Sequence, residues 1–111
     1  MEQIFTLHRT KKEVKKTKTV WTLESQNGGK AEFTSRPKAV RGFCRQHPSR
    51  EYRFITDGGQ TYTIRENDGG WQVIADGKTI NCTSLTRAVN ALLNGGYLTH
   101  IEKFQIVIPE I

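Results

Sequence analysis

The side chains best suited to chemistry in this chain are the lysines and arginines of its first half. The segment from Arg9 to Lys18 holds six cations and one anion. Residues 1–60 carry 13 Lys and Arg against 6 Asp and Glu, whereas residues 61–111 carry 4 against 5. A cation that neutralises a phosphate releases condensed counterions, so a segment of this kind attracts nucleic acid, an anionic membrane or an acidic protein surface.

A second basic group falls in a helix that the apolar spacing predicts over residues 36–46. We expect its four cations to lie off the apolar stripe, with Arg41 and Arg45, one turn apart, on one surface. The predicted helix of the second half has a single outward cation, Arg87, so a basic helix is not a requirement of the fold. The candidate nucleic-acid-binding residues combine the lysines of the first segment with the cations of the first helix: Lys11, Lys12, Lys15, Lys16, Lys18, Arg36, Lys38, Arg41 and Arg45.

Metal-binding and catalytic patterns are weak or missing in the sequence. Cys44 and His47 have the spacing of half a zinc site, but a structural zinc site needs a second closely spaced pair. The chain has no G-x-S-x-G elbow, no local Cys–His signature and no paired carboxylates. Its glycine pairs fall at turns or at a helix end, and not before a helix, where a phosphate-cradling loop belongs. The sequence therefore predicts no enzyme, no metal site and no cofactor.

The elements that position the basic residues follow from the alternation of polar and apolar side chains. In the second half, three alternating runs between residues 61 and 82 are separated by glycine turns, which predicts three antiparallel strands. A helix follows, with Thr83 or Ser84 as its N-cap. The segment Lys103–Ile108 alternates again and predicts a final strand.

The first half follows the same order of predicted elements. Each half has a Trp, a Gly-Lys turn and then Thr-Ser-x-x-(Lys or Arg)-Ala-Val, at Thr34–Val40 and at Thr83–Val89. The first helix is capped by Thr34 or Ser35, and a strand is expected at Glu51–Ile55. Between its first two strands the first half has seven more residues than the second, and most of the lysines fall there.

These patterns predict an α+β protein made of two tandem βββαβ units. Each unit is expected to be an antiparallel sheet covered by one helix, and the two units are expected to share one core. Residues 1–58 would form the first unit, with the lysine-rich hairpin, and residues 59–111 the second, within one compact domain. The alternative is a single mixed α+β sheet without internal symmetry.

The second half also resembles a known family. The residues that carry the resemblance are Trp71-x-Val73, Asp76-Gly77-Lys78 and Thr83-Ser84-x-x-x-Ala88-Val89-x-x-Leu92. This run resembles the three-stranded-sheet, arm-binding DNA-binding domains at the N-termini of phage-type integrases. It resembles to the same degree small bacterial proteins built from tandem βββα units. Because the integrase domains place sheet residues in the major groove, the resemblance implies such a role for Arg65, Gln72 and Lys78.

Charge and pattern together predict a small, basic, non-enzymatic protein that binds nucleic acid through the phosphate backbone. A duplex is favoured over single strands because Trp21, Phe33 and Phe43 fall on the expected core side, where bases cannot stack on them. The alternative is a protein-interaction or inhibitor module, of phage or mobile-element type, that binds an acidic protein surface. No apolar run reaches the roughly 20 residues that cross a bilayer, and the N-terminus shows no secretory signal, so we expect a cytoplasmic protein without a membrane partner.

Overall fold

The computed structural model of the chain describes residues 3–13, 17–26, 28–98 and 101–109. Within these ranges the predicted helix over residues 36–46 and the predicted final strand over residues 103–108 are confirmed. Eight strands and two helices are described, in the order β1 (Gln3–Glu13), β2 (Thr17–Ser25), β3 (Lys30–Phe33), α1 (Arg36–Gln46), β4 (Glu51–Thr56), β5 (Thr61–Asn67), β6 (Gly70–Ala75), β7 (Lys78–Cys82), α2 (Leu85–Asn94) and β8 (Lys103–Ile108).

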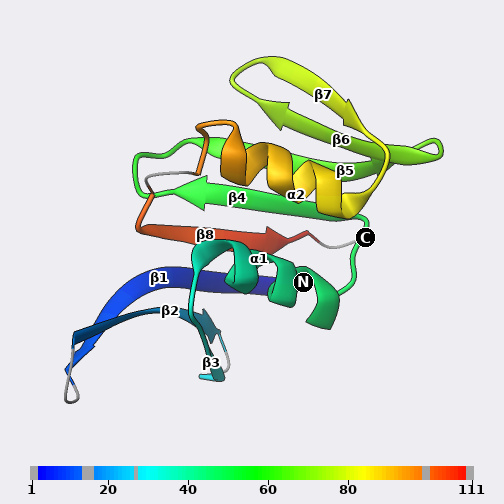
Figure 1. Cartoon of the computed structure of the whole chain (residues 1–111). Coiled ribbons are helices and arrows are strands. Elements are labelled where there is room, and N and C mark those ends of the chain that lie inside the picture. Colours follow the sequence, from blue (N-terminus) through cyan, green and yellow to red (C-terminus); the bar gives the residue numbers. More distant parts are fainter. Residues whose placement is uncertain (1–2, 14–16, 27, 99–100, 110–111) are drawn as a thin grey trace.

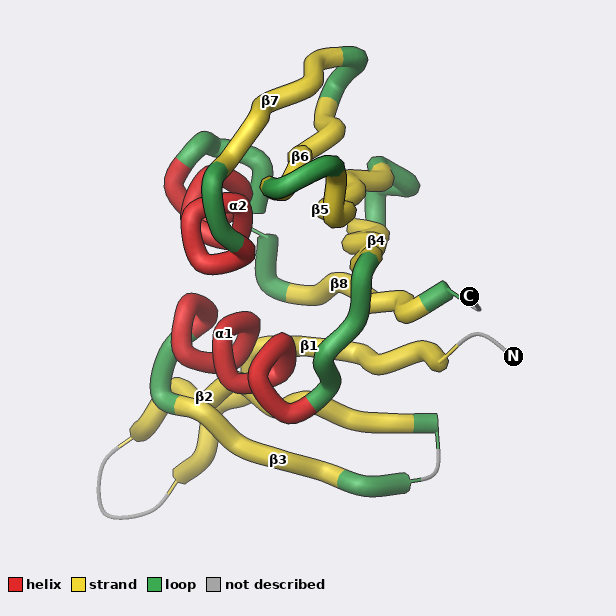
Figure 2. The backbone as a smooth tube through the Cα atoms, turned by 90° about the vertical axis from the view of Figure 1, so that its right-hand side faces the viewer, coloured by secondary structure: helices red, strands yellow, loops and turns green. Residues whose placement is uncertain are grey.

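The eight strands form one antiparallel sheet with the order β3-β2-β1-β8-β4-β5-β6-β7 (Figure 1). The sheet is curved, and both helices lie on its concave side (Figure 2). Helix α1 packs against β2 and β3, and α2 packs against β5, β6 and β7. The convex side of the sheet is covered by neither helix. In the described part of the chain, neither helix is long and apolar enough to cross a membrane.

A single hydrophobic core lies between the concave side of the sheet and the helices. Strand β4 shows how alternation builds it, since Tyr52, Phe54 and Thr56 are buried and the residues between them are half-buried. Each large side chain that leaves water completely contributes about 2 kcal/mol to folding. The largest fully buried side chains come from both halves of the chain: Tyr52, Phe43, Phe54, Phe104, Leu7 and Ile64.

The expected pair of βββαβ units, each with its own sheet under one helix, is wrong. The turn over residues 57–60 makes β4 and β5 a hairpin, in which Thr56 N donates to Gln60 O at 2.9 Å and Gly59 has a φ of +84°. The last strand of the first half therefore joins the first strand of the second half. Strand β8, the last of the second half, pairs with β1 and β4. The alternation of polar and apolar residues specifies which side chains face the core, but it does not specify which strands pair with each other.

The strand order is symmetric about its centre. If β1 to β4 are exchanged with β5 to β8, the order read from one edge becomes the order read from the other edge. Leu7 lies opposite Leu23 and Phe104, in the same way that Ile64 lies opposite Val73 and Tyr52. Tyr52 and Phe104 are therefore equivalent positions.

Two residues further along each strand, Phe54 and Ile106 are also equivalent, and these two lie opposite each other in the ladder between β4 and β8. A further pair of backbone hydrogen bonds is equivalent too, from Glu66 N to Arg50 O at 2.7 Å and from Arg9 N to Glu102 O at 2.9 Å. A pseudo-twofold axis thus passes through the centre of the sheet.

Candidate nucleic-acid interface

Helix α1 presents most of its cations away from the sheet because of where it begins. Ser35 has an extended backbone, and its hydroxyl accepts a hydrogen bond from the Lys38 N–H, so it caps the helix, while the proline that follows sits in the first turn. The buried side is formed by Ala39, Val40, Phe43 and Cys44. At 100° per residue, positions 38, 41 and 45 then point outward or sideways. The side chains of Lys38, Arg41 and Arg45 are exposed, as expected from the sequence.

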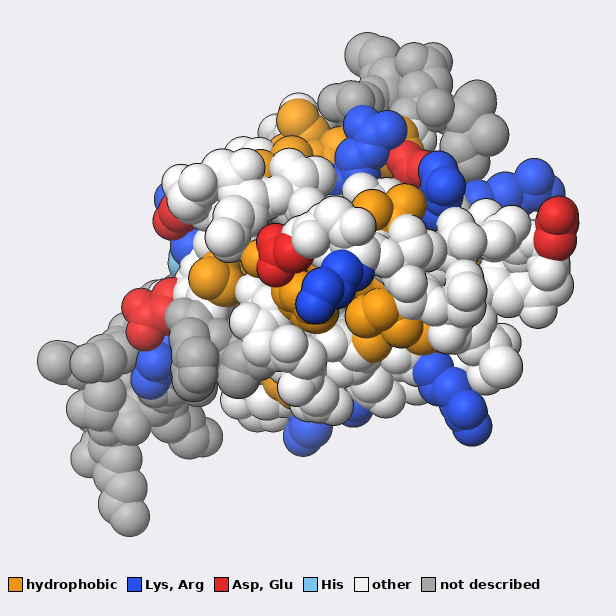
Figure 3. Space-filling model, turned by 90° about the horizontal axis from the view of Figure 1, so that it is seen from above, with side chains coloured by type: hydrophobic (Ala, Val, Ile, Leu, Met, Phe, Trp, Pro, Cys, Tyr) orange, Lys and Arg blue, Asp and Glu red, His pale blue; other side chains and the backbone are white. Residues whose placement is uncertain are grey.

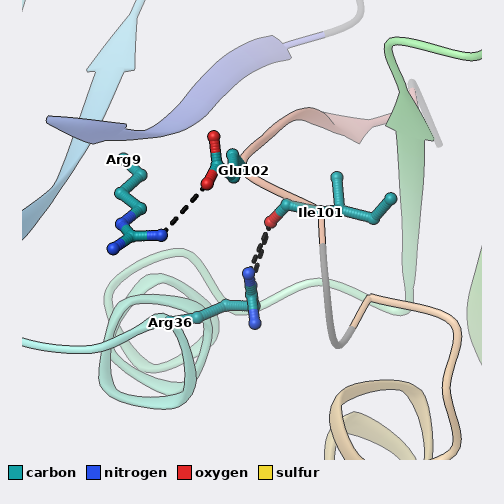
Figure 4. Close-up of polar contacts among 4 residues, drawn as sticks. All are labelled: Arg9, Arg36, Ile101 and Glu102. Carbon is teal, nitrogen blue, oxygen red and sulfur yellow. Dashed lines mark hydrogen bonds and ion pairs between the residues drawn. The ribbon is translucent and has the colours of Figure 1, made fainter.

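Arg36 points toward the sheet, so the expectation that it lies off the apolar stripe is wrong. Its guanidinium carbon lies 4.5 Å from the centroid of the Trp21 ring, and its Nε and Nη2 donate to the Ile101 carbonyl at 3.1 and 2.6 Å. Figure 4 shows this contact beside the ion pair of Arg9 and Glu102, whose Nη1 and Oε1 are 3.0 Å apart. Burial, and then the charge of Arg9, lower the pKa of Arg36 from its ordinary value.

The second helix contributes one cation, Arg87, that is not among the candidate residues predicted from the sequence. Ser84 caps α2 in the same way that Ser35 caps α1, with the Arg87 N–H donating to its hydroxyl at 3.2 Å. Arg87 therefore occupies the position in α2 that Lys38 occupies in α1, opposite the buried side of its helix. It is exposed. The Thr-Ser sequence that precedes both helices identifies Arg87 as the counterpart of Lys38.

The two helices touch at equivalent positions. Arg41 donates a hydrogen bond to the side-chain oxygen of Asn90, and each residue lies the same number of positions after its capping serine. The helices run in opposite directions (Figure 1), as a twofold axis between them requires. We call the outward surface of α1 and α2 the helix face, and its cations are Lys38, Arg41, Arg45 and Arg87.

Neither helix contains an acidic residue. The four cations of the helix face form no ion pair with any residue in the described ranges. Along the lower edge of Figure 3, which is the helix-bearing side, the charged side chains to the right of the grey atoms are Lys or Arg. The helix face is therefore uniformly positive.

Three acidic side chains on the strands and in the loop before β8 are instead paired with cations: Glu24, Glu51 and Glu102. Glu24 lies 3.1 Å from His8 Nε2, and the hydrogen bond to His8, followed by the charge of Lys30, lowers the pKa of Glu24 from its ordinary value. The other ion pairs join oppositely charged groups at 3.0 to 3.9 Å: Arg9–Glu102, Lys30–Glu24 and Arg53–Glu51. At these three residues positive and negative charge cancel locally, whereas the helix face has no carboxylate.

The lysine-rich segment forms a two-stranded arm. Strand β1 pairs with β8 only from Gln3 to His8, whereas its pairing with β2 continues to Glu13. Trp21 still pairs with Phe33 of β3, and Arg9 N donates to Glu102 O. We therefore call residues 10–13 and 17–20 the arm, and four residues of strand give it a length of about 14 Å. The described ends of β1 and β2 curve toward the helix-bearing side (Figure 2).

The arm contains three of the five predicted lysines. Lys12 and Lys18 are opposite each other in the ladder, and Lys11 is opposite Thr19. Lys15 and Lys16 lie outside the described residues. The backbone thus brings Lys11, Lys12 and Lys18 to one end of the sheet, on the side where α1 lies.

The sheet residues implied by the integrase resemblance lie on the convex side or at its edge. Arg65 Nε donates to Gln72 Oε1 at 3.4 Å, and Gln72 Nε2 donates to Asn81 Oδ1 at 3.2 Å. These side chains form a row across β5, β6 and β7. Lys78 is exposed at the start of β7. Because the polar groups of the row bond to one another, part of their hydrogen-bonding capacity is already used.

A polar hollow of about 680 Å³ opens where β1 and β8 meet the turn after β4. Its charged lining residues are three bases and three acids: His8, Arg9, Lys103, Glu24, Asp57 and Glu102. Two of the acids already pair with His8 and Arg9 at 3.1 and 3.0 Å. The hollow therefore adds no net positive charge to the surface that would meet a polyanion.

Groups able to perform metal or covalent chemistry are sparse in the described part of the chain. It contains no cluster of three or more His, Cys, Asp or Glu side chains that could hold a metal ion. Cys44 is buried, and burial raises the pKa of its thiol to about 12, which keeps it protonated near neutral pH. The structure thus uses Cys44 as a core residue, packed beside Val40 and Phe43.

Comparisons with known proteins add no relationship to this description. No family model, no curated protein sequence and no solved structure matches the chain. The resemblance to integrase arm-binding domains stays a prediction. The arrangement of charge and the shape of the molecule are therefore the features that bear on its function.

Proposed function

We propose that the protein binds nucleic acid through the phosphate backbone, using the helix face together with the lysines of the arm. The observation that carries the proposal is the segregation of charge. Four cations lie on two helices that contain no carboxylate, while the ion pairs of the described residues lie among the strands and the loop before β8. Unpaired surface cations gathered on one side attract a polyanion and release its counterions on contact.

The distribution of aromatic side chains favours a duplex. All ten Phe, Trp and Tyr residues lie in the described part of the chain and are buried or packed against the core. The one large hydrophobic side chain exposed within the described residues is Ile80. Single-strand binders usually add aromatic surfaces on which bases stack, at about 1–3 kcal/mol per base. A surface of cations without aromatics suits the regular backbone of a duplex.

The test is the affinity for a random-sequence duplex as a function of salt. Each phosphate contact should weaken binding about three- to fourfold between 50 and 200 mM salt. Two charge-matched variants separate the helix face from the rest of the surface: Lys38→Gln/Arg45→Gln and Lys30→Gln/Lys103→Gln. The first should lower affinity and flatten the salt dependence, whereas the second, on the strands, should leave both close to wild type.

The arm is tested by changing Lys11, Lys12, Lys15, Lys16 and Lys18 to Gln in one variant. It should flatten the salt dependence further than the helix variant, since more cations are removed. A wild-type protein that shows no detectable binding at 50 mM salt would sink the proposal and leave an acidic protein surface as the partner to test. Equal losses in the two charge-matched variants would show that binding follows net charge alone, and would remove the helix face from the proposal.

A further inference from the structure

Two cations of the helix face are related by the pseudo-twofold axis. Lys38 and Arg87 each lie three residues after a capping serine, and their N–H groups donate to Ser35 Oγ and Ser84 Oγ at 3.3 and 3.2 Å. Both side chains are exposed and lie opposite the buried side of their helices. The axis passes between Arg41 and Asn90, so Lys38 and Arg87 stand on either side of it.

The spacing of this pair follows from helix geometry. Packed helices lie about 8–10 Å apart, and residues three positions from the axis are displaced by about 4.5 Å along antiparallel helices, in opposite directions. The two Cα atoms are then separated by about 13 Å. That separation is close to the width of the major groove of B-form DNA, about 12 Å.

From this relationship we infer that the helix face binds double-stranded B-form DNA across one groove. The pseudo-twofold axis of the protein coincides with a local dyad of the duplex, and Lys38 and Arg87 contact phosphates on opposite strands. The inference rests on the proposed function and specifies its ligand. A duplex backbone has such a dyad whatever its sequence, and proteins with twofold symmetry match it in this way. A single strand has none, and the major groove of A-form RNA is deep and narrow.

The other cations of the helix face break the symmetry in a defined manner. Arg41 lies at the axis and is bonded to its equivalent, Asn90. The residue equivalent to Arg45 is Asn94, the last residue of α2, which carries no charge. One strand should therefore receive an additional contact from Arg45, while Lys38 and Arg87 serve the two strands equally. We therefore expect one symmetric pair of phosphate contacts, from Lys38 and Arg87, and one asymmetric contact, from Arg45.

The experiment measures the affinity of the full chain for a 20-base-pair random DNA duplex, the matching single strand and a duplex RNA, across a salt series. Lys38→Gln and Arg87→Gln are compared with Lys103→Gln, which removes one charge from the convex side. Each of the first two should weaken duplex DNA binding about eightfold at 0.1 M salt and reduce the salt slope by about one contact. Their effects should multiply in the double variant, and Lys103→Gln should change neither quantity.

The outcomes distinguish this inference from the proposed function. Tighter binding to duplex DNA than to the other two ligands, with matched losses for Lys38→Gln and Arg87→Gln, supports it. If Lys38→Gln weakens binding and Arg87→Gln does not, or if the single strand or the duplex RNA binds as well as duplex DNA, the dyad arrangement is wrong although the protein binds nucleic acid. If no nucleic acid binds at low salt, both proposals fail together.

Discussion

Arg41 and Asn90 are hydrogen-bonded across the two helices, and each is the counterpart of the other in the two halves of the chain. In the sheet beneath them, Phe54 and Ile106 form a second pair of counterparts that lie opposite each other. The same axis therefore passes through the helix layer and through the sheet. A substitution at a residue on this axis therefore affects contacts made by both halves of the chain.

Replacing Phe54 by Ala should destabilise both halves together. Phe54 is completely buried in the strand that the first half contributes to the centre of the sheet, and such truncations cost about 3–5 kcal/mol. Urea unfolding followed by fluorescence should keep a single transition at lower urea, because Trp21 and Trp71 report on different halves of one sheet. The control is Ile55→Ala, at a half-buried neighbour, which should cost far less. Separate transitions in Trp21→Phe and Trp71→Phe versions would contradict the shared core.

Gly42→Ala should destabilise the protein, although helix propensity alone predicts a gain of about 1 kcal/mol. A Cβ at this position would lie 2.8 Å from Cε1 of Phe33, on the edge strand β3. Forcing the ring aside should cost about 1–3 kcal/mol, measured by urea unfolding. In a Phe33→Leu background the same change should be neutral or stabilising. A gain in stability in the wild-type background would show that the ring moves freely.

Arg36→Gln should lower the free energy of unfolding by about 2 kcal/mol, because it removes the contact with Trp21 and the charged hydrogen bonds to the Ile101 carbonyl. Arg45→Gln, at an exposed position of the same helix, should change it by less than about 0.5 kcal/mol. Thermal and urea unfolding of the two variants provide the comparison. Equal stabilities would mean that the Arg36 contacts contribute nothing to folding.

Stability should fall as the pH rises above about 8.5, the ordinary pKa of a thiol. Burial raises the pKa of Cys44 to about 12, so the unfolded chain loses this proton first and gains from alkaline pH. The loss should reach at most about 1.4 kcal/mol per pH unit for one group, and burial of Tyr52, whose pKa is also raised to about 12, should steepen it above about pH 10.

Unfolding in urea at pH 7, 9 and 10 checks this dependence. Cys44→Ala should flatten the decline between pH 9 and 10, whereas Cys82→Ala, at a half-exposed position, should leave it unchanged. A Cys44→Ala variant with the wild-type slope would assign the alkaline sensitivity to another group. Reducing agent must be present throughout, since both thiols are free.

The helices and most strands could be located from the sequence because their determinants are local. Ser35, the proline in the first turn and the apolar stripe are enough to bound α1. The pairing of β8 with β1 and β4 could not be found in this way, because it joins residues about a hundred and about fifty positions apart, and alternation alone accepts several partners. The sequence marks a turn at Gly58 and Gly59, but a turn alone does not show whether the strands on either side form a hairpin or belong to separate units.

The candidate site shows the same division between local and distant causes. The outward positions of Lys38, Arg41 and Arg45 follow from helical spacing and were predicted. The inward position of Arg36 depends on Trp21 and Ile101, which lie on other elements. Leu85 holds the equivalent place on the apolar stripe of α2, so a comparison of the two helices position by position would have placed Arg36 correctly.

Because the strand order of the sheet is palindromic, either half of the chain could come first without changing the topology of the sheet. Gln3 lies opposite Ile108 in adjacent strands, and the exposed turn over residues 57–60 joins the halves. A linker between β8 and β1, combined with a break between Gly58 and Gly59, would give a circular permutant that starts with β5 and ends with β4. Its strands would occupy the same sheet in the same order, because exchanging the halves leaves the topology unchanged.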